Sequence, residues 1–377
     1  MSDEAPDAVV PAGATPTSTS SLSPLVFTGS GSEYFRIWVV NTVLTIATLG
    51  IYSAWAKVRK SSYFARNTRL LGDGFEFTAD PLAILRGRVL ALALLGFYTF
   101  AFDFSLTLGL IATTLLLAAA PLLFASAMRF RLHNTRWRAM RFEFTARLRT
   151  VYQAVLIVAL LWVSTTVAAA LGGGTSVAVM GVLSVLSLPW MHHRLKAFQH
   201  GHVAFAGAAS VFRPGLLEFY GTYVVASVLL AFAGIVGAIA AGVSVYWLRD
   251  VPDSRTAGFI GGIAVAGMGY VAAWPYFAAR IQRTVWDRTT LGSHSFTTTI
   301  SSAQAFPIVL KNAALLLMTA GLYWPYASIS WARYRIGCMS IVSPESPAAA
   351  IASLEPRVGP AATSEGAIDF FGIDIGW

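Results

Sequence analysis

Long stretches without a charged residue constrain this chain most. Residues 150–191 hold no Asp, Glu, Lys or Arg over 42 positions, and residues 89–128 hold only Asp103 over 40 positions. A helix needs about 20 apolar residues to cross a bilayer, so each run is long enough for two spans. Four further uncharged runs have single-span length: 37–56, 219–248, 256–279 and 312–332. The sequence therefore predicts an all-α fold, a polytopic transmembrane helix bundle with about eight spans.

The remaining charge is unevenly distributed. Only 12% of the residues are charged, and the net charge is +9. Basic side chains gather in four segments between the predicted spans, at 57–88, 129–149, 192–218 and 280–311. By the positive-inside rule these segments are cytoplasmic, and eight spans put both termini on the other side. The regular alternation favours a topology signal over nucleic-acid binding, so we expect no nucleic-acid partner.

A basic, aromatic phrase occurs twice. Residues 67–79 read NTRLLGDGFEFTA, and residues 134–146 read NTRWRAMRFEFTA, with eight of thirteen positions identical. The alignment extends to four copies that share a small or proline residue at the start of each basic segment: Ala54, Pro121, Pro189 and Pro275. Asp73-Gly74 between short alternating runs is a hairpin signal. We expect a bundle built from internal repeats, with short hairpin-like cytoplasmic loops.

A fifth, partial copy ends the repeated region. Its residues recur from the first copy at a constant offset of 271, as Phe35/Phe306, Asn41/Asn312, Gly50/Gly321 and Tyr52/Tyr323. Eight spans would give these two segments opposite orientations. Either the resemblance tolerates inversion, or one of the two segments is re-entrant.

Three arginines occupy one repeat position and follow an aromatic residue. They are Arg59, Arg194 and Arg280, with Trp55, Trp190 and Tyr276 beside them. Aromatic rings are favoured at headgroup depth, and basic side chains near the membrane attract anionic lipid. We expect a positive collar that binds anionic membrane lipids. The alternative is that these arginines only set orientation during membrane insertion.

Polar side chains inside the predicted spans are few. The candidates are Asn41, Gln153 and Asn312, and each could instead hydrogen-bond a neighbouring helix. Gly258 and Gly262 have the spacing of a close helix–helix contact, which predicts tight packing between the spans at 219–248 and 256–279.

Histidines cluster at one place, as His192, His193, His200 and His202. Such a group could bind zinc or nickel. However, Lys196 lies on the same helical face, where it repels a cation, so a variant of the basic segment is the favoured interpretation. No phosphate-binding loop, catalytic triad or carboxylate pair is visible. We therefore expect no metal, no cofactor and no enzymatic activity.

The opening of the chain resembles a known family. Residues 27–77 carry F-x-G-x-G, Tyr-Phe, an Asn, Thr-Leu-Gly-Ile-Tyr, Trp-Ala, an Arg, Asn-Thr and Gly-x-x-Phe. This pattern resembles the YjgN-like bacterial inner-membrane proteins, a family of unknown function. The resemblance implies a multi-pass protein of the bacterial inner membrane, and it implies no reaction.

Composition divides the chain into three parts. Residues 1–32 and 343–377 are predicted to be disordered tails, the second with an apolar end, and residues 33–342 form the repeated transmembrane domain. Repeated multi-span bundles are often transporters, so a transporter or channel for a small molecule is the favoured activity. The alternative is a non-transporting membrane protein that organises anionic lipid or partner proteins through its basic loops.

Overall fold

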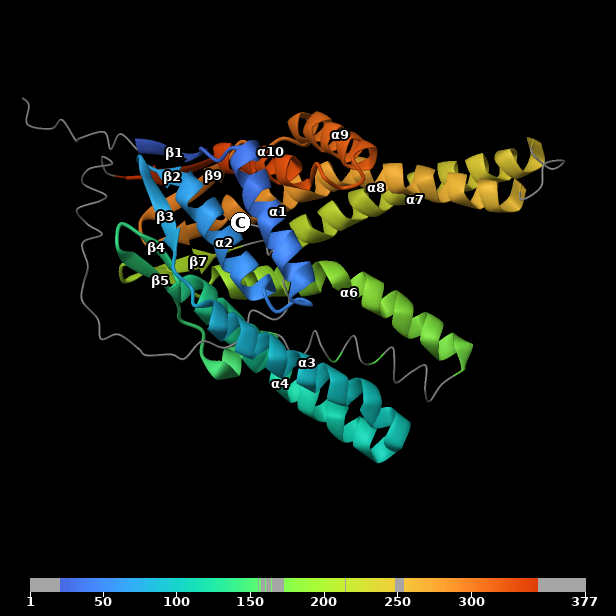
Figure 1. Ribbon diagram of the computed structural model, residues 1–377, viewed down its shortest axis with the longest axis horizontal. Coiled ribbons are helices and arrows are strands. Elements are labelled where there is room, and N and C mark those ends of the chain that lie inside the picture. The colour runs from blue at the N-terminus through green and yellow to red at the C-terminus, as the bar shows by residue number, and fades with distance from the viewer. Residues whose placement is uncertain are drawn as a thin grey trace, which may run out of the picture.

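The computed structural model describes residues 21–344 except 155, 157–159, 161–163, 165–172, 214 and 248–253. Short strands and pairs of helices alternate along this part of the chain. The strands gather at one end of the molecule, and most of the helices extend from that end as separate arms (Figure 1).

The strands form one closed antiparallel barrel in the order β1-β10-β9-β8-β7-β6-β5-β4-β3-β2. The prediction of an all-α bundle is therefore wrong. The ten strands have three to seven residues each: β1 (Ser21–Phe27), β2 (Thr68–Leu70), β3 (Asp73–Phe77), β4 (Thr135–Trp137), β5 (Met140–Phe144), β6 (Val203–Phe205), β7 (Ala208–Phe212), β8 (Thr289–Leu291), β9 (His294–Thr298) and β10 (Met339–Ser343).

Local sequence explains the β-hairpins between the helix pairs. Trp137 of β4 is buried, whereas Arg141 of β5 is exposed, as expected for strands with one apolar and one polar face. The β2–β3 turn is at Leu71-Gly72, with φ of 54° and 88°, and not at Asp73-Gly74 as predicted. The β4–β5 turn has φ of 48° and 65° at Arg138 and Ala139 without any glycine. Two successive positive φ values are those of a type I′ turn, whose twist matches the strands.

Helices leave the barrel and return to it in pairs. The helices that the structure describes are α1 (Gly31–Ala47), α2 (Ser53–Asn67), α3 (Pro81–Phe104), α4 (Leu106–His133), α6 (Gly174–His200), α7 (Leu216–Trp247), α8 (Ser254–Trp286), α9 (Ser302–Met318) and α10 (Trp324–Gly337). Residues 148–154 are also helical. The α3–α4 pair, α6 and the α7–α8 pair form the long arms in Figure 1, while the other helices stay near the barrel.

The prediction of about eight spans is also wrong. Five helices in the described part of the chain are long and apolar enough to cross a membrane: α3, α4, α6, α7 and residues 258–286 of α8. The predicted span at 37–56 instead contains the end of α1, a turn and the start of α2, and 312–332 contains the same parts of α9 and α10. Both turns consist of uncharged residues, so hydropathy does not distinguish them from a continuous span.

The two ends of the repeated region lie side by side. β1 pairs with both β2 and β10, so the strands at both ends belong to the same barrel as the basic hairpins. The structure therefore places residues 21 and 343 with the basic hairpins, and not opposite them as the eight-span topology predicted. All five copies have one orientation, and Pro325 occupies in the fifth copy the position of Ala54, Pro121, Pro189 and Pro275.

The expected tail boundaries fall differently in the structure. Residues 21–27 lie inside the segment expected to be a tail and form β1. Residues 1–20 and 345–377, which make up most of both expected tails, are outside the described residues.

The close packing of α7 against α8 is confirmed. A Cβ at Gly262 would lie 3.2 Å from the carbonyl oxygen of Gly237, and a Cβ at Gly258 would lie 3.0 Å from that of Ala241. Small residues therefore let the two backbones approach, as is typical of helix pairs in lipid.

Candidate functional site

A chamber of about 1340 Å³ occupies the barrel and extends between the helices above it. All ten strands contribute lining residues, as do helices α1, α2, α4, α6, α8, α9 and α10. The chamber therefore follows the axis around which the five copies are arranged.

Large apolar side chains surround the chamber where it lies inside the barrel. One residue from each even-numbered strand occupies the same repeat position, namely Leu70, Trp137, Phe205, Leu291 and Ile341. Neighbouring rings are in contact, with centroids 6.1 Å apart for Trp137 and Phe205 and 4.5 Å apart for Phe142 and Phe205. We call the five residues of the even-numbered strands the apolar ring.

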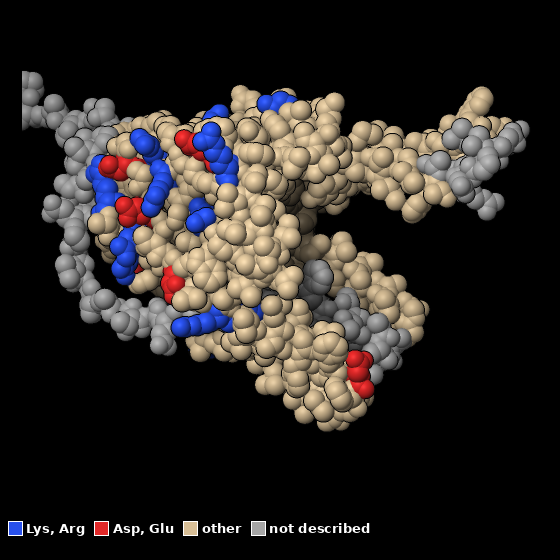
Figure 2. Space-filling model, in the orientation of Figure 1, with Lys and Arg blue, Asp and Glu red and all other residues tan. Residues whose placement is uncertain are grey.

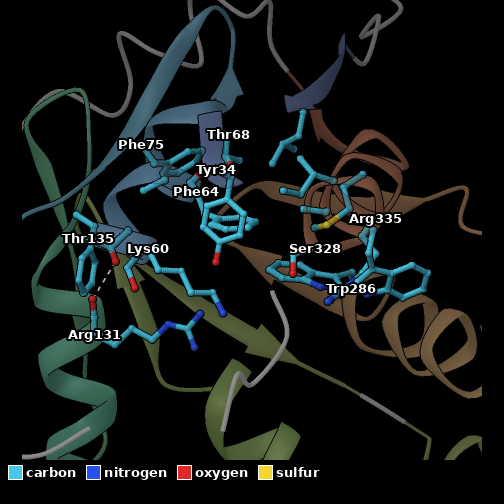
Figure 3. Close-up of a pocket in the computed structure, with 18 of the residues that line it drawn as sticks. Tyr34, Lys60, Phe64, Thr68, Phe75, Arg131, Thr135, Trp286, Ser328 and Arg335 are labelled. Atoms are coloured by element: carbon cyan, nitrogen blue, oxygen red, sulfur yellow. Dashed lines mark hydrogen bonds between the residues drawn. The ribbon is translucent and has the colours of Figure 1, made fainter. Parts of the chain in front are cut away.

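Basic side chains line the chamber nearer the helices. Lys57 and Lys60 come from α2, Arg131 from α4 and Arg335 from α10, and all four are half-buried. In Figure 3 the charged ends of Lys60 and Arg131 point into the same space, with Arg335 beyond them near Trp286. Among the described residues, no Asp or Glu lines the chamber. The Lys and Arg side chains therefore give this part of the wall a positive charge within an otherwise largely apolar lining.

A polar contact fixes the orientation of one of these cations. The Arg335 Nε donates to Gln282 Oε1 of α8 at 2.6 Å, and Gln282 Nε2 donates to the Arg335 carbonyl oxygen at 3.1 Å. Gln282 is only 4% exposed. This reciprocal pair holds the guanidinium in place before any ligand arrives.

Two of the three predicted intramembrane polar residues belong to the wall of the chamber. Asn41 of α1 and Asn312 of α9 both line it, with exposures of 7% and 6%. Neither Oδ1 atom has a hydrogen-bond donor within the described part of the chain. Gln153 is exposed and does not line the chamber.

The predicted collar lies outside the chamber. Arg59, Arg194 and Arg280 are exposed, on α2, α6 and α8, and none of them lines the cavity. The guanidinium of Arg59 lies 5.8 Å from the Tyr52 ring, and that of Arg194 lies 5.8 Å from the Trp190 ring. Trp55, Trp190 and Tyr276 are half-buried. The three arginines thus face outward from the helices that surround the chamber, whereas the aromatic side chains beside them are partly covered.

The clustered histidines contact different neighbours. His192 Nδ1 is 3.1 Å from the Tyr223 hydroxyl, whereas His202 Nδ1 is 2.9 Å from the Phe198 carbonyl oxygen. The His200 ring packs edge-on against Trp286. Within the residues that the structure describes, no three His, Cys, Asp or Glu side chains are arranged to hold a metal ion.

Surface charge separates the molecule into two regions. Figure 2 shows Lys, Arg, Asp and Glu gathered over the barrel and the adjacent helix ends, whereas the arms are almost free of charge. Bilayer hydrocarbon accommodates apolar helices, and the charged exterior of the barrel requires water. The fold therefore defines a membrane protein with apolar helical arms and an extramembrane barrel.

Comparison with known proteins agrees with this class. The model of the family described as "Bacterial protein of unknown function (DUF898)" matches residues 22–370, and the chain belongs to this family. It is 30% identical over 180 residues to the inner membrane protein YjgN of Salmonella typhimurium, covering 44% of each chain. It is 33% identical over 131 residues to that of Escherichia coli K12, covering 33% of this chain and 31% of the relative. No solved structure matches the chain.

These comparisons confirm the resemblance to the YjgN-like proteins and the location in the bacterial inner membrane. The matched stretches cover less than half of these curated relatives.

The chamber cations were not recognised in the sequence. The basic segments that contain them predict a topology signal and an outer collar, and not a cationic chamber wall. The repeat contained a usable indication, because Arg131 and Arg335 occupy the same repeat position, ten residues after Pro121 and Pro325.

Proposed function

We propose that the protein is a transporter or channel, and that its solute passes through the chamber along the axis of the barrel. The observation that carries the proposal is a single cavity lined by all ten strands and by seven of the helices. Such a cavity supplies a central route from the apolar helices into the barrel.

The apolar ring supplies a gate for this route. Hydrophobic constrictions can close a pore by excluding water, without filling it completely. The five ring positions come from five copies of the repeat, so small displacements of the hairpins would alter the opening together. This supports a channel-like gate inside the barrel.

Conductance in planar bilayers tests the proposal. The purified full-length protein is compared with Leu291→Ser, which places a hydroxyl in the apolar ring at a half-buried position, and with Thr290→Ser in the same strand as a matched control. We expect Leu291→Ser to raise ion conductance above both the wild type and Thr290→Ser, because a polar group favours wetting of the constriction. If correctly folded wild type and Leu291→Ser both give only the leak of protein-free bilayers, the transport proposal is wrong.

A second function is favoured by the exposed collar. Because Arg59, Arg194 and Arg280 face outward beside aromatic rings, they could organise anionic lipid around the helices. The test is the triple change of these arginines to Gln in the full-length protein, with retained anionic lipid measured by native mass spectrometry. If both the topology and the amount of retained anionic lipid are unchanged, the collar does not bind lipid and these arginines act at most during membrane insertion.

A further inference from the structure

We propose that the chamber binds an anionic amphiphile, with an oxyanion head group held by Lys60, Arg131 and Arg335 and an apolar tail along the aromatic wall. The inference deepens the proposed function, on which it rests, by naming the chemical class of molecule that enters the pathway. Binding and conductance are measured separately, so the two proposals can fail separately.

The positive charge of the site comes from basic side chains of different copies of the repeat, which line the same chamber. Lys60, Arg131 and Arg335 lie on α2, α4 and α10, and all three line the chamber. Like charges brought together in a partly buried wall repel one another, and a bound oxyanion reverses that penalty. Arginine is well suited to the task because its planar guanidinium can hold phosphate or carboxylate by two hydrogen bonds.

Gln282 is the positioning residue of this site. It accepts from Arg335 Nε at 2.6 Å and is almost completely buried, so it fixes the orientation of the Arg335 guanidinium. An arginine held before ligand binding loses less conformational entropy when the ligand arrives. The geometry therefore favours an anion-binding site over a basic surface that contacts only water.

The size and chemistry of the chamber indicate more than a small anion. Its volume of about 1340 Å³ exceeds the roughly 300–1,000 Å³ of ordinary small-molecule pockets. Aromatic residues make up much of the wall between the cations and the barrel, including Phe64, Phe75 and Trp286. An inorganic ion would leave this apolar surface uncovered, whereas an acyl chain would cover it.

The chamber also reaches the part of the molecule that faces lipid. Ile46 of α1 and Tyr270 and Trp274 of α8 line it, and they are 71%, 57% and 41% exposed. Residues 258–286 of α8 form one of the five candidate membrane-crossing helices. An amphiphile can therefore enter from the bilayer with its tail between the helices and its head toward the cations.

The two asparagines supply an independent indication of a ligand. Asn41 Oδ1 and Asn312 Oδ1 are buried acceptors in the chamber wall with no donor among the described residues. A buried acceptor without a donor is costly, and a ligand hydroxyl or ammonium group would satisfy it. The amphiphile is thus expected to carry hydrogen-bond donors as well as its anionic group, as a phosphoglycerol head group does.

Lipid titration of the purified full-length protein in detergent tests the site. Binding of phosphatidylglycerol, phosphatidylcholine and inorganic phosphate is followed by native mass spectrometry. The chamber variant is Lys60→Gln/Arg131→Gln/Arg335→Gln. The matched control is Arg66→Gln/Arg69→Gln/Arg213→Gln, which removes the same charge from exposed positions that belong neither to the chamber nor to the collar. We expect phosphatidylglycerol to bind more tightly than phosphatidylcholine, and the chamber variant to weaken it about tenfold or more.

The outcomes separate the competing sources of binding. Loss in the control variant but not in the chamber variant would place the lipid on the outer surface and overturn the inference. Binding of inorganic phosphate with no preference for phosphatidylglycerol would identify a small-anion site and overturn the amphiphile. Tight, chamber-dependent lipid binding in a protein without conductance would remove the transport proposal and leave this site standing.

A second variant keeps the inference testable if the chamber variant does not fold. Asn41→Leu/Asn312→Leu replaces each amide by an apolar group of the same branched shape and removes the two unsatisfied carbonyls, so the ligand-free protein should melt at an unchanged or higher temperature. Phosphatidylglycerol should nevertheless bind at least threefold more weakly. Unchanged binding in this stable variant would contradict a ligand that hydrogen-bonds to Asn41 and Asn312.

Discussion

The hydroxyls of Thr48 and Thr319, 271 residues apart, make the same two hydrogen bonds. Each donates at 2.7 Å to the carbonyl oxygen four residues earlier, that of Leu44 or Leu315. Each also accepts from the backbone N–H four residues later, that of Tyr52 at 2.9 Å or Tyr323 at 3.0 Å. The first and last helix pairs therefore reverse direction by the same turn, and neither segment is inverted relative to the other.

Removing one of these hydroxyls should destabilise its turn. Thr48→Val and Thr319→Val keep the side-chain shape but leave the N–H of Tyr52 or Tyr323 without its acceptor, and we expect a loss of roughly 1–2 kcal/mol from each. Thr99→Val is the matched control, because the Thr99 hydroxyl only donates to a carbonyl of its own helix. Thermal unfolding in detergent measures the difference, and equal melting temperatures for Thr48→Val and Thr99→Val would contradict the account.

Both ends of the chain should report from the cytoplasmic side. β1 and β10 pair in the barrel that carries the basic hairpins, and basic segments remain cytoplasmic. A fluorescent protein fused to either end of the full chain should therefore mature. Alkaline phosphatase inserted at Ser105, where α3 ends and α4 begins, should be active outside the cytoplasm. An active phosphatase at either end would mean that one helix pair does not return to the barrel.

Neighbouring glycines of α8 should differ sharply in their tolerance of a side chain. Gly262 faces α7, where an added Cβ would lie 3.0 Å from Ala241 Cβ, whereas a Cβ on Gly261 meets nothing within 4 Å. Gly262→Leu should separate the helices at a cost of about 1–3 kcal/mol, as overpacking does. Gly261→Leu should be close to neutral. Both variants are compared by their melting temperatures, and the reverse ranking would disprove the packing.

Cys338 should react slowly with thiol reagents. Burial raises the pKa of its thiol above the ordinary value, although hydrogen bonds from Thr299 and Tyr334 partly offset the effect. Because the thiolate is the reactive form, the modification rate at neutral pH should lie below that of the denatured chain and should rise over a more alkaline range. Cys338 is the chain's single cysteine, so a colourimetric disulfide reagent reports on it alone. Equal rates before and after denaturation would contradict this environment.

Sequence patterns predicted the parts of the fold that depend on local composition. The uncharged runs identified the long arms, and the Gly258–Gly262 spacing identified the α7–α8 contact. The barrel was missed because nine of its ten strands have only three or five residues, which is too short for a reliable period, and because their pairing joins distant hairpins. The short helix pairs were missed because their turns are uncharged.

The candidate site was predicted only in part. Asn41 and Asn312 stood out as amides in apolar segments, and both line the chamber. The cations did not stand out, since composition does not separate Lys60, which lines the chamber, from the adjacent Arg59, which is exposed. That distinction depends on which face of α2 points toward the axis of the barrel, and the axis exists only in the assembled fold.

The pairing of β1 with β10 has a consequence for biosynthesis. Ser21 lies opposite Ser343, so the first described strand meets its last partner only after more than 300 intervening residues have been made. Ribosomes extend a chain by about 5–20 residues per second, which leaves the first strand with an unpaired edge for tens of seconds. During this time each helical arm can enter the bilayer in turn while its hairpin waits in the cytoplasm. Ring closure is then the final step, and a chain released before β10 would keep open strand edges of the kind that quality-control proteases and aggregation act upon.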